Sequence, residues 1–314
     1  MVTVEQAQQE LNIKKIACGS VSWLDVEMPT LAEMEYLRTT FDFHTLALDD
    51  CLSRVQLPKM DDYDDYLFLV LHFPLFNQEA RLTVPSQVSI FVSGDYLVTV
   101  HRGDLRPLMK LFADCEASEP VRKNVMGHSS GYLLYQVLDG LVDYCFPSLN
   151  KVIERVDDLE VRVFDMAAKD LARELLVTKR DILAYRRIVR PQIEVLELLE
   201  KKEYPFLKVD PDVYFGDLAD HMRRISVELE DLKEVIQGLH DTHVSLTTDR
   251  TNEVIRTLTI IATIMLPLSV LSGLYGMNVS LPFDSSPYAF LVVLGVMAIV
   301  AGGMLLFFRS RRWF

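Results

Sequence analysis

The chain has 314 residues, a formal net charge of −13 and a hydrophobic content of 50%. This length allows about two globular domains together with a further segment. Because so acidic a chain is poorly matched to the phosphate backbone of nucleic acids, we expect no nucleic-acid partner.

The cysteines and the N-terminus bear on the cellular compartment. Cys18, Cys51, Cys115 and Cys145 stand far apart and lack the close pairing of zinc or redox sites. Free thiols in a reducing compartment fit this spacing. Residues 1–15 are polar and lack the basic stretch and apolar run of a signal peptide. We therefore expect most of the chain to lie in the cytosol.

Residues 1–126 show mixed periodicity, which predicts a cytosolic α/β domain. Apolar runs at 21–26 and 66–73 are typical of strands, and 87–92 with 96–101 predicts a hairpin. Helical spacing of apolar residues occurs at 31–40 and 105–115. The pattern does not predict the order of the strands.

Residues 127–253 are helical in pattern. Two amphipathic segments, Tyr132–Val163 and Leu171–Leu199, are joined by a short link at 165–170 and predict an antiparallel helical hairpin. Pro147 and Pro191 fall inside these segments, so we expect a kink or a local break at each.

A regular apolar seam follows Pro211, with steps of four and three residues that are typical of a helix packed lengthwise against partners. Its members are Leu218, Met222, Ile225, Leu229, Leu232, Ile236 and Leu239, then His243 and Leu246. No proline occurs between Pro211 and Pro267. One long helix, a stalk, is therefore predicted to continue into the next segment.

Residues 254–314 contain two apolar segments that predict a transmembrane hairpin. Leu258–Leu274 and Tyr288–Phe308 carry no charged residue, and each approaches the length that crosses a bilayer. We predict spans at about 254–274 and 288–308, joined by an outer loop at 275–287. A lipid bilayer is therefore an expected partner.

Charge placement predicts the orientation of this hairpin. Arg250 and Arg256 precede the first span, and Arg309, Arg311 and Arg312 follow the second, whereas the loop carries neither Lys nor Arg. The positive-inside bias then places both chain termini in the cytoplasm. We expect an integral protein of the inner membrane of the cell.

One stripe of the first span repeats at a period near 3.5 residues and includes small or weakly polar side chains. Its members are Asn252, Ile255, Leu258 or Thr259, Ala262, Leu266, Ser269 and Gly273. Spacing alone leaves two interpretations open: close helix packing, or the lining of a pore formed by several copies. Two spans cannot enclose an aqueous path, so transport would require a homo-oligomer.

Several motifs together resemble the CorA family of magnesium channels. They are the run from Leu258 to Pro267, the sequence Tyr275-Gly276-Met277-Asn278, and a second span ending in arginines and Trp313. Further similar stretches are 44–50, 132–139 and 214–221. The resemblance covers nearly the whole chain.

The resemblance implies an α/β cytosolic domain and a long helical stalk that continues into a two-span transmembrane hairpin, assembled as a funnel-shaped homopentamer. The first spans would line the pore, with Gly276, Met277 and Asn278 as the selectivity filter. A ring of Asn278 amides could hold hydrated Mg²⁺ without stripping its water. Co²⁺ or Ni²⁺ are further candidate ions.

It also implies gating. Ile255, Leu258 and Leu266 would form apolar rings that close the pore by dewetting. Asp241 and Asn252 would lie at the cytosolic mouth. Regulatory Mg²⁺ would bind between neighbouring subunits, and the matching carboxylates are Asp50 and Asp217, with Asp49 and Asp220 nearby.

One departure from the family concerns the outer loop, where Asp284 is the single acidic residue and many family members carry several. This predicts weak electrostatic capture of cations at the outer mouth.

Two other functions remain as alternatives. A zinc transporter of the ZntB type shares the architecture but typically replaces the residue at Met277, which therefore favours magnesium. A membrane-anchored cytosolic enzyme or scaffold is disfavoured, because no nucleophile and base, glycine-rich phosphate loop or clustered metal ligands are apparent. We expect no enzymatic activity.

Overall fold

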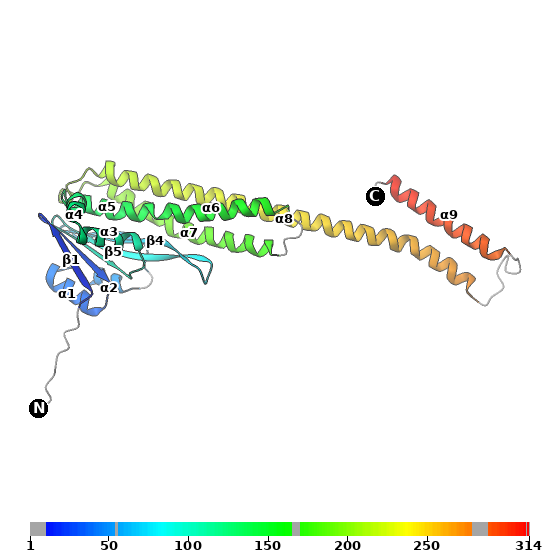
Figure 1. Cartoon of the computed structure of the whole chain (residues 1–314), viewed down its shortest axis with the longest axis horizontal. Coiled ribbons are helices and arrows are strands. Elements are labelled where there is room, and N and C mark those ends of the chain that lie inside the picture. The colour runs from blue at the N-terminus through cyan, green and yellow to red at the C-terminus, as the bar shows by residue number, and fades with distance from the viewer. Residues whose placement is uncertain (1–10, 54–55, 165–169, 278–287, 312, 314) are drawn as a thin grey trace, which may run out of the picture. The chain divides into compact units, whose positions relative to one another are not determined.

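The computed structural model describes residues 11–53, 56–164, 170–277, 288–311 and 313 (Figure 1). They fall into two compact units, one within residues 1–240 and the other within 241–314. Helix α8, Pro211–Tyr275, is continuous over 65 residues and contributes to both units. The sequence predicted such an unbroken helix after Pro211.

The described strands of the first unit form one six-stranded sheet in the order β1-β2-β6-β5-β4-β3. Strands β2 and β6 are parallel and all the other neighbours are antiparallel. The strands are β1 Ile13–Cys18, β2 Val21–Glu27, β3 Lys59–Asp62, β4 Leu67–Asn77, β5 Leu82–Val92 and β6 Tyr96–His101. The predicted α/β class and the β5–β6 hairpin are therefore confirmed, whereas β1 and β3 were not predicted.

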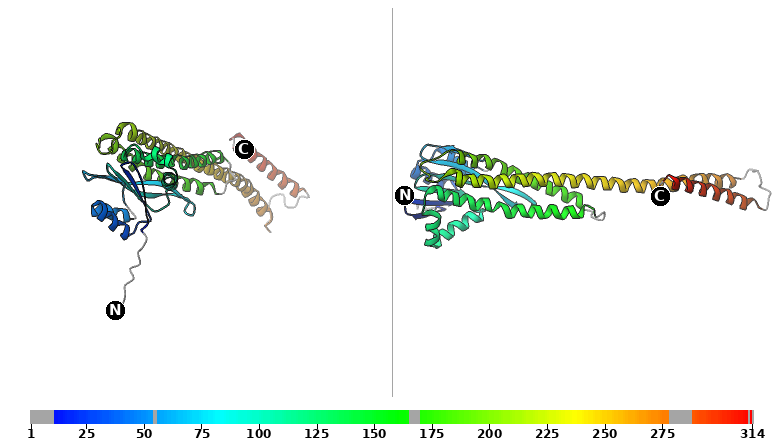
Figure 2. Two further views of the ribbon diagram at one scale, coloured as in Figure 1. Left: turned by 60° about the vertical axis from the view of Figure 1, so that its left-hand side comes forward. Right: turned by 90° about the horizontal axis from the view of Figure 1, so that it is seen from above.

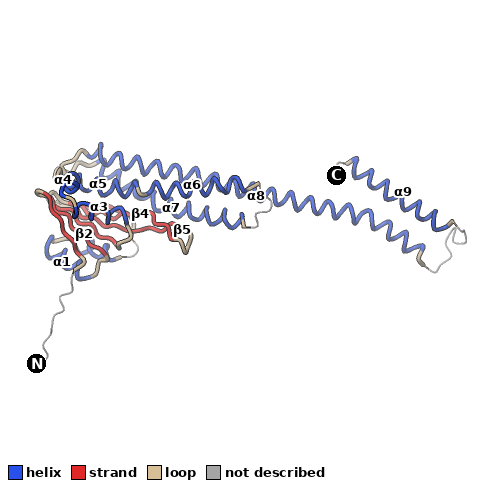
Figure 3. The backbone as a smooth tube through the Cα atoms, viewed as in Figure 1, coloured by secondary structure: helices blue, strands red, loops and turns tan. Residues whose placement is uncertain are grey.

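Helices cover both faces of this sheet, which gives three layers (Figure 3). Successive strand residues point to opposite faces. On one face, Phe68, Val70 and Phe91 pack with helices α1, Leu31–Phe41, and α2, Thr45–Leu52. On the other face, alternate residues such as Leu69 and Ile90 join a larger core with the later helices.

Helix α1 begins with a capping box, in which the side chains of Thr30 and Glu33 each bond the other's backbone N–H group. Glu33 also accepts a hydrogen bond from the backbone N–H of Asn12 at 3.0 Å. Burial alone would raise the pKa of Glu33, but hydrogen bonds from the Thr30 hydroxyl and from the Asn12 and Thr30 backbone N–H groups outweigh it and leave the pKa below its usual value. The cap therefore also fixes the start of β1.

The larger core is built from helices that run beside the sheet (Figure 2). They are α3 Arg106–Ala117, α4 Glu119–Met126, α5 Ser130–Asp143, α6 Cys145–Arg162 and α7 Leu171–Lys201, with the first part of α8. The predicted segment Tyr132–Val163 is divided at Tyr144, close to Pro147. Helix α7 in contrast continues through Pro191.

The predicted seam of α8 is the part of the helix that its own chain covers. Every seam residue from Leu218 to Leu239 is buried in the larger core. Charged pairs flank it: Arg223 contacts Glu197 of α7 at 3.0 Å, and Arg186 of α7 contacts Glu230 at 2.5 Å. The partners of this seam are thus helices of the same chain.

A fully buried carboxylate ties α6, α7 and β5 together. Asp181 of α7 accepts a hydrogen bond from the Thr83 backbone N–H at 2.6 Å and from Arg155 Nη1 at 2.9 Å. Its side chain is 0% exposed, and that of Arg155 is 30% exposed. A buried ion pair of this kind is costly to break, because the remaining charge keeps the desolvation cost without its partner.

We predict that Asp181→Asn destabilises the protein by about 3 kcal/mol, which lowers the melting temperature by roughly 5–10 °C. The matched control is Asp157→Asn on the exposed face of α6, where we expect less than about 0.5 kcal/mol. Thermal unfolding of the purified chain, followed by intrinsic fluorescence, measures both. Equal melting temperatures for the two variants would contradict this role of Asp181.

Candidate functional site

The second unit presents apolar helices that its own chain leaves largely uncovered. Within the two windows most suited to crossing a membrane, only 6% of residues in α8 and 0% in α9, Ala289–Ser310, are buried. A core helix of a soluble protein would instead be mostly buried. Both helices are long and apolar enough to cross a bilayer.

The predicted stripe of the first span lies on the open side of α8. Because the helix is continuous here, positions three and four apart share one face. All members of the stripe are exposed, with Leu258 at 60% and Leu266 at 68% exposure. They are Asn252, Ile255, Leu258 or Thr259, Ala262, Leu266, Ser269 and Gly273.

The opposite side of the same helical segment is more enclosed. Its residues are buried or half-buried: Ile260, Ile264, Pro267, Leu268 and Leu271. The segment therefore has one covered face and one open face within a single copy. The open face is the one that carries the small and weakly polar residues.

Several threonine hydroxyls on α8 are satisfied within the helix. Thr259 donates to the backbone carbonyl of Ile255 at 2.8 Å, and Thr263 donates to that of Thr259 at 2.6 Å. Thr251 and Thr257 form the same bond to the residue four positions earlier. Such bonds let a threonine face lipid or an apolar helix without an unpaired donor.

The end of α8 carries the first residues of the predicted filter. The helix ends at Tyr275, and the Gly276 N–H donates to the Ser272 carbonyl at 3.0 Å. A Cβ at Gly276 would lie 3.2 Å from that carbonyl oxygen, which favours glycine here. Met277 is exposed. Asn278 and the loop acid Asp284 lie outside the described residues.

The predicted regulatory carboxylate Asp50 is already paired within its own chain. Its Oδ2 lies 2.7 Å from Lys59 Nζ, and its Oδ1 accepts a hydrogen bond from Gln56 at 2.6 Å. Burial alone would lower the pKa of Lys59, but its bonds to Asp50 and Asp61 outweigh burial and raise it. Asp49, its neighbour on α2, is exposed. A cation at Asp50 must therefore compete with Lys59.

Asp217 lies in a different setting, beside other carboxylates. Asp139 of α5 has its pKa raised by burial and by the nearby charges of Asp143 and Asp217, against a smaller opposite effect of His221. His221 Nε2 is 3.8 Å from Asp217 Oδ1. Asp220, one turn along, instead pairs with Arg223. This acidic cluster, Asp139, Asp143 and Asp217, has His221 beside it but no paired lysine or arginine among the described residues.

The two predicted regulatory residues, Asp50 and Asp217, do not pair with each other within one copy of the chain. In the described part of the chain, Asp50 and Asp217 share no hydrogen bond or ion pair and have separate neighbours. The sequence did not predict that Asp139 lies near the charges of Asp143 and Asp217. The sequence contains one indication of this pair. Asp139 ends the family-like stretch 132–139, and Asp143 follows four residues later on the same helix face.

Asp241 lies on α8 and is exposed. The four cysteines are free, as predicted. No group of three or more His, Cys, Asp or Glu residues has metal-binding geometry within the described ranges.

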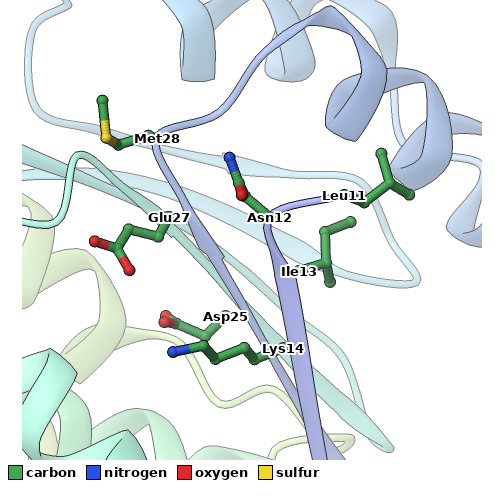
Figure 4. Close-up of a pocket in the computed structure, with 7 residues that line it drawn as sticks. All are labelled: Leu11, Asn12, Ile13, Lys14, Asp25, Glu27 and Met28. Carbon is green, nitrogen blue, oxygen red and sulfur yellow. The ribbon is translucent and has the colours of Figure 1, made fainter. Parts of the chain in front are cut away.

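A pocket of about 340 Å³ with both polar and apolar lining residues lies beside β1 and β2, with Asp25 in its wall (Figure 4). The Asp25 carboxylate accepts a hydrogen bond from Thr99 at 2.6 Å and lies 3.1 Å from His101 Nε2. The Gly103 N–H donates to His101 Nδ1 at 2.9 Å, so Nε2 carries the proton that reaches Asp25. This buried network was not predicted, and it ties β2 to β6.

Comparisons with known proteins identify the family. The family model of the CorA-like Mg²⁺ transporter protein matches residues 19–312. The YfjQ protein of Bacillus subtilis is 32% identical over 100% of this chain and 97% of its own length. The cobalt/magnesium transport protein CorA of Thermotoga maritima is 30% identical, over 87% of this chain and 77% of its own length.

More distant matches agree on the fold. The solved structure of the CorA magnesium transporter from Methanocaldococcus jannaschii superposes with a TM-score of 0.84 over 100% of both chains, at 21% identity. A zinc transport protein, ZntB of Pectobacterium carotovorum, is 22% identical over 93% of this chain and 87% of its own length. The two apolar helices, the long helix and the family match agree: this chain is a membrane protein that belongs to the CorA-like Mg²⁺ transporter family.

Proposed function

We propose that this chain is the subunit of a passive, homopentameric Mg²⁺ channel of the inner membrane, with α8 of each copy lining the pore. The observation that carries the proposal is the open, uncharged stripe of α8, which the rest of the copy leaves uncovered. Membership of a Mg²⁺ transporter family supplies the substrate class.

The need for several copies follows from geometry and solvation. Two spans cannot surround water, and the open stripe carries Ser269 and Gly273 on the face that its own chain leaves uncovered. Assembly around an axis would turn these residues toward a common lumen. The covered face, with Ile264 and Leu271, would remain toward the second spans and the lipid.

The proposed filter is a ring of Asn278 side chains, directly after the end of α8. Mg²⁺ requires octahedral oxygen ligation and loses water slowly. Neutral amide oxygens can hold its hydration shell through hydrogen bonds, whereas a ring of carboxylates would bind it more tightly and slow its release. Gly276 and Met277 would set the backbone that presents this ring.

Orientation is part of the proposal. Arg250 and Arg256 precede the span, and Arg309 and Arg311 follow the second. We assign both termini to the cytoplasm on the positive-inside bias. Asp241 and Asn252 would then lie at the cytosolic mouth and attract cations to it.

Gating is assigned to cytosolic Mg²⁺ bound between subunits. The acidic cluster, together with Asp220, would form one side of such a site, and Asp50 with Asp49 of a neighbouring copy the other. Like charges that repel without metal would be bridged by the bound ion. Release of the ion would let the subunits separate and the rings of Ile255, Leu258 and Leu266 wet.

Ion flux tests the substrate and the filter together. We expect liposomes containing the protein to take up Mg²⁺, and Co²⁺ or Ni²⁺ to follow because they hydrate similarly. Asn278→Ala should abolish this uptake, because methyl groups cannot hold the hydrated ion. Asn150→Ala, the same change on the exposed face of α6, is the control.

Uptake of Zn²⁺ in preference to Mg²⁺ would replace the proposal with a zinc transporter. Unchanged Mg²⁺ uptake by Asn278→Ala would remove Asn278 as the filter. If no divalent ion passes in the wild type, the channel assignment itself fails.

A matched pair of variants tests which face of α8 lines the pore. Leu258→Thr, on the stripe, should raise uptake several-fold when cytosolic-side Mg²⁺ is high, because a polar ring lowers the cost of wetting. Leu271→Thr makes the same change on the covered face and should leave closed-state uptake low. The reverse result would assign the pore to the other face.

The acidic cluster predicts a cation- and pH-dependent stability. The pKa of Asp139 is raised in the folded protein, so its ionised form lowers the free energy of unfolding at neutral pH. This cost disappears as the pH falls toward the ordinary aspartate pKa of 3.8 and the carboxyl becomes protonated. Asp139→Asn should therefore raise the melting temperature of metal-free protein at pH 7. At pH 4 the same substitution should change the melting temperature little.

Mg²⁺ should raise the melting temperature of the wild type. At a hundredfold excess of Mg²⁺ over its dissociation constant, binding should add about 2.7 kcal/mol to the free energy of unfolding. Asp217→Asn should remove most of this gain. Asp231→Asn, also exposed on α8, should retain it. Equal Mg²⁺ responses in the two variants would overturn the role of Asp217 without affecting the flux assignment.

A further inference from the structure

A pocket of about 280 Å³ lies in the first unit, away from α8, between α6 and the β4–β5 hairpin. The strand residues Phe76 and Thr83, which are register partners, form one wall. Tyr144, Ser148 and Lys151 stand on the side of α6. None of the residues assigned to conduction or gating lines this pocket.

The pocket is basic, although the chain as a whole is strongly acidic. Its charged lining residues are Arg106, Lys151, Arg155 and Asp181. The one carboxylate is fully buried and already bonded to the Thr83 backbone N–H and to Arg155. Its charge therefore compensates Arg155 and leaves the two other cations uncompensated.

The side chains of Arg106 and Lys151 form no hydrogen bond or ion pair across the described ranges, and both are exposed. Asp104, the acid nearest to Arg106 in the sequence, accepts a hydrogen bond from the Ser86 hydroxyl at 2.5 Å. Two unpaired cations at one pocket repel each other and are stabilised by an anion with several acceptor oxygens.

Other groups at the pocket suit the same kind of ligand. The hydroxyls of Tyr144 and Ser148 line it and can donate to an oxyanion. Arg106 is the first residue of α3, and no side chain caps that end of the helix. The positive end of a helix dipole thus adds to the field of the arginine.

An aromatic side chain adds an apolar surface beside these donors. The guanidinium of Arg155 lies over the Phe76 ring, 5.3 Å from its centroid, and the ring remains partly exposed. A planar group could contact this ring while its phosphates reach Arg106 and Lys151. The volume is at the low end for ligand pockets and excludes a folded macromolecule.

We propose that this pocket binds a small phosphorylated metabolite, of which a nucleoside phosphate is the class that uses all of its features. The phosphates are held by Arg106, Lys151 and the two hydroxyls, and the base lies against Phe76. Arg155 acts mainly as a structural side chain, fixed by Asp181. The proposal is independent of the channel function, because it shares no residue with the pore or the acidic cluster.

Calorimetry on the full-length protein in detergent tests the site. The protein is first freed of divalent ions with a chelator, so that chelation of Mg²⁺ by the nucleotide cannot imitate binding. The probes are ATP, inorganic pyrophosphate and, at equal ionic strength, sodium sulfate. We expect ATP and pyrophosphate to bind with one site per chain, and ATP to bind more tightly because of Phe76.

Two double variants distinguish binding at the pocket from a general effect of lost positive charge. Arg106→Gln with Lys151→Gln removes both unpaired cations and should weaken ATP binding by at least about tenfold. Arg102→Gln with Lys110→Gln removes the same charge from exposed positions nearby and should bind like the wild type. Unliganded melting temperatures within about 2 °C of the wild type establish that both variants are folded.

Two results would overturn the proposal. One is that neither ATP nor pyrophosphate binds the wild type, and the other is that both double variants lose affinity equally. Pyrophosphate binding with no advantage for ATP would remove the nucleoside from the proposal and limit the ligand to the phosphate group. Normal Mg²⁺ uptake by the first double variant would keep this site separate from the channel function.

Discussion

Helix α8 is one unbroken helix whose first part belongs to the first unit and whose last part is apolar enough to lie in a lipid bilayer. The rest of the structure depends on which residues bury each part of this helix. From Leu218 to Leu239 its apolar positions are buried by helices of the same chain. From Asn252 to Gly273 one face stays open in the described residues. Because a helix satisfies its own backbone hydrogen bonds, it can pass from water into lipid without exposing unpaired polar groups. The side chains alone then determine which setting each part requires.

Electrostatics divides the first unit into compensated and uncompensated regions. Asp50 and Asp181 each have a basic partner in the same copy, so the chain itself neutralises them. Asp139 and Asp217 lie near each other with His221 as their basic neighbour, and no acid pairs with Arg106 or Lys151 among the described residues. For the partly buried Asp139, burial and the neighbouring negative charges raise the free energy of the ionised carboxylate.

Periodicity predicted the long elements well, because burial of one helix face leaves a regular apolar pattern. The seam of α8, the paired helices and the two apolar segments were all apparent from it. Strands β1 and β3 were missed because Lys14, Lys15 and the acidic end of β3 interrupt any alternation. The strand order depends on the parallel β2–β6 pair, which joins distant segments. The pairing of Asp50 with Lys59 and the approach of Asp139 to Asp217 likewise depend on tertiary contacts.

The burial of the α8 seam has a consequence for the order of folding during synthesis. The sheet and its α1–α2 layer use residues before His101, so this smaller core can form early. The larger core lacks Phe215, Met222 and Leu229 until α8 has been made. Those residues are translated only shortly before the first apolar segment at Leu258. Because domains fold as units while the chain grows, completion of the first unit and membrane insertion of the second fall within the same short interval of translation.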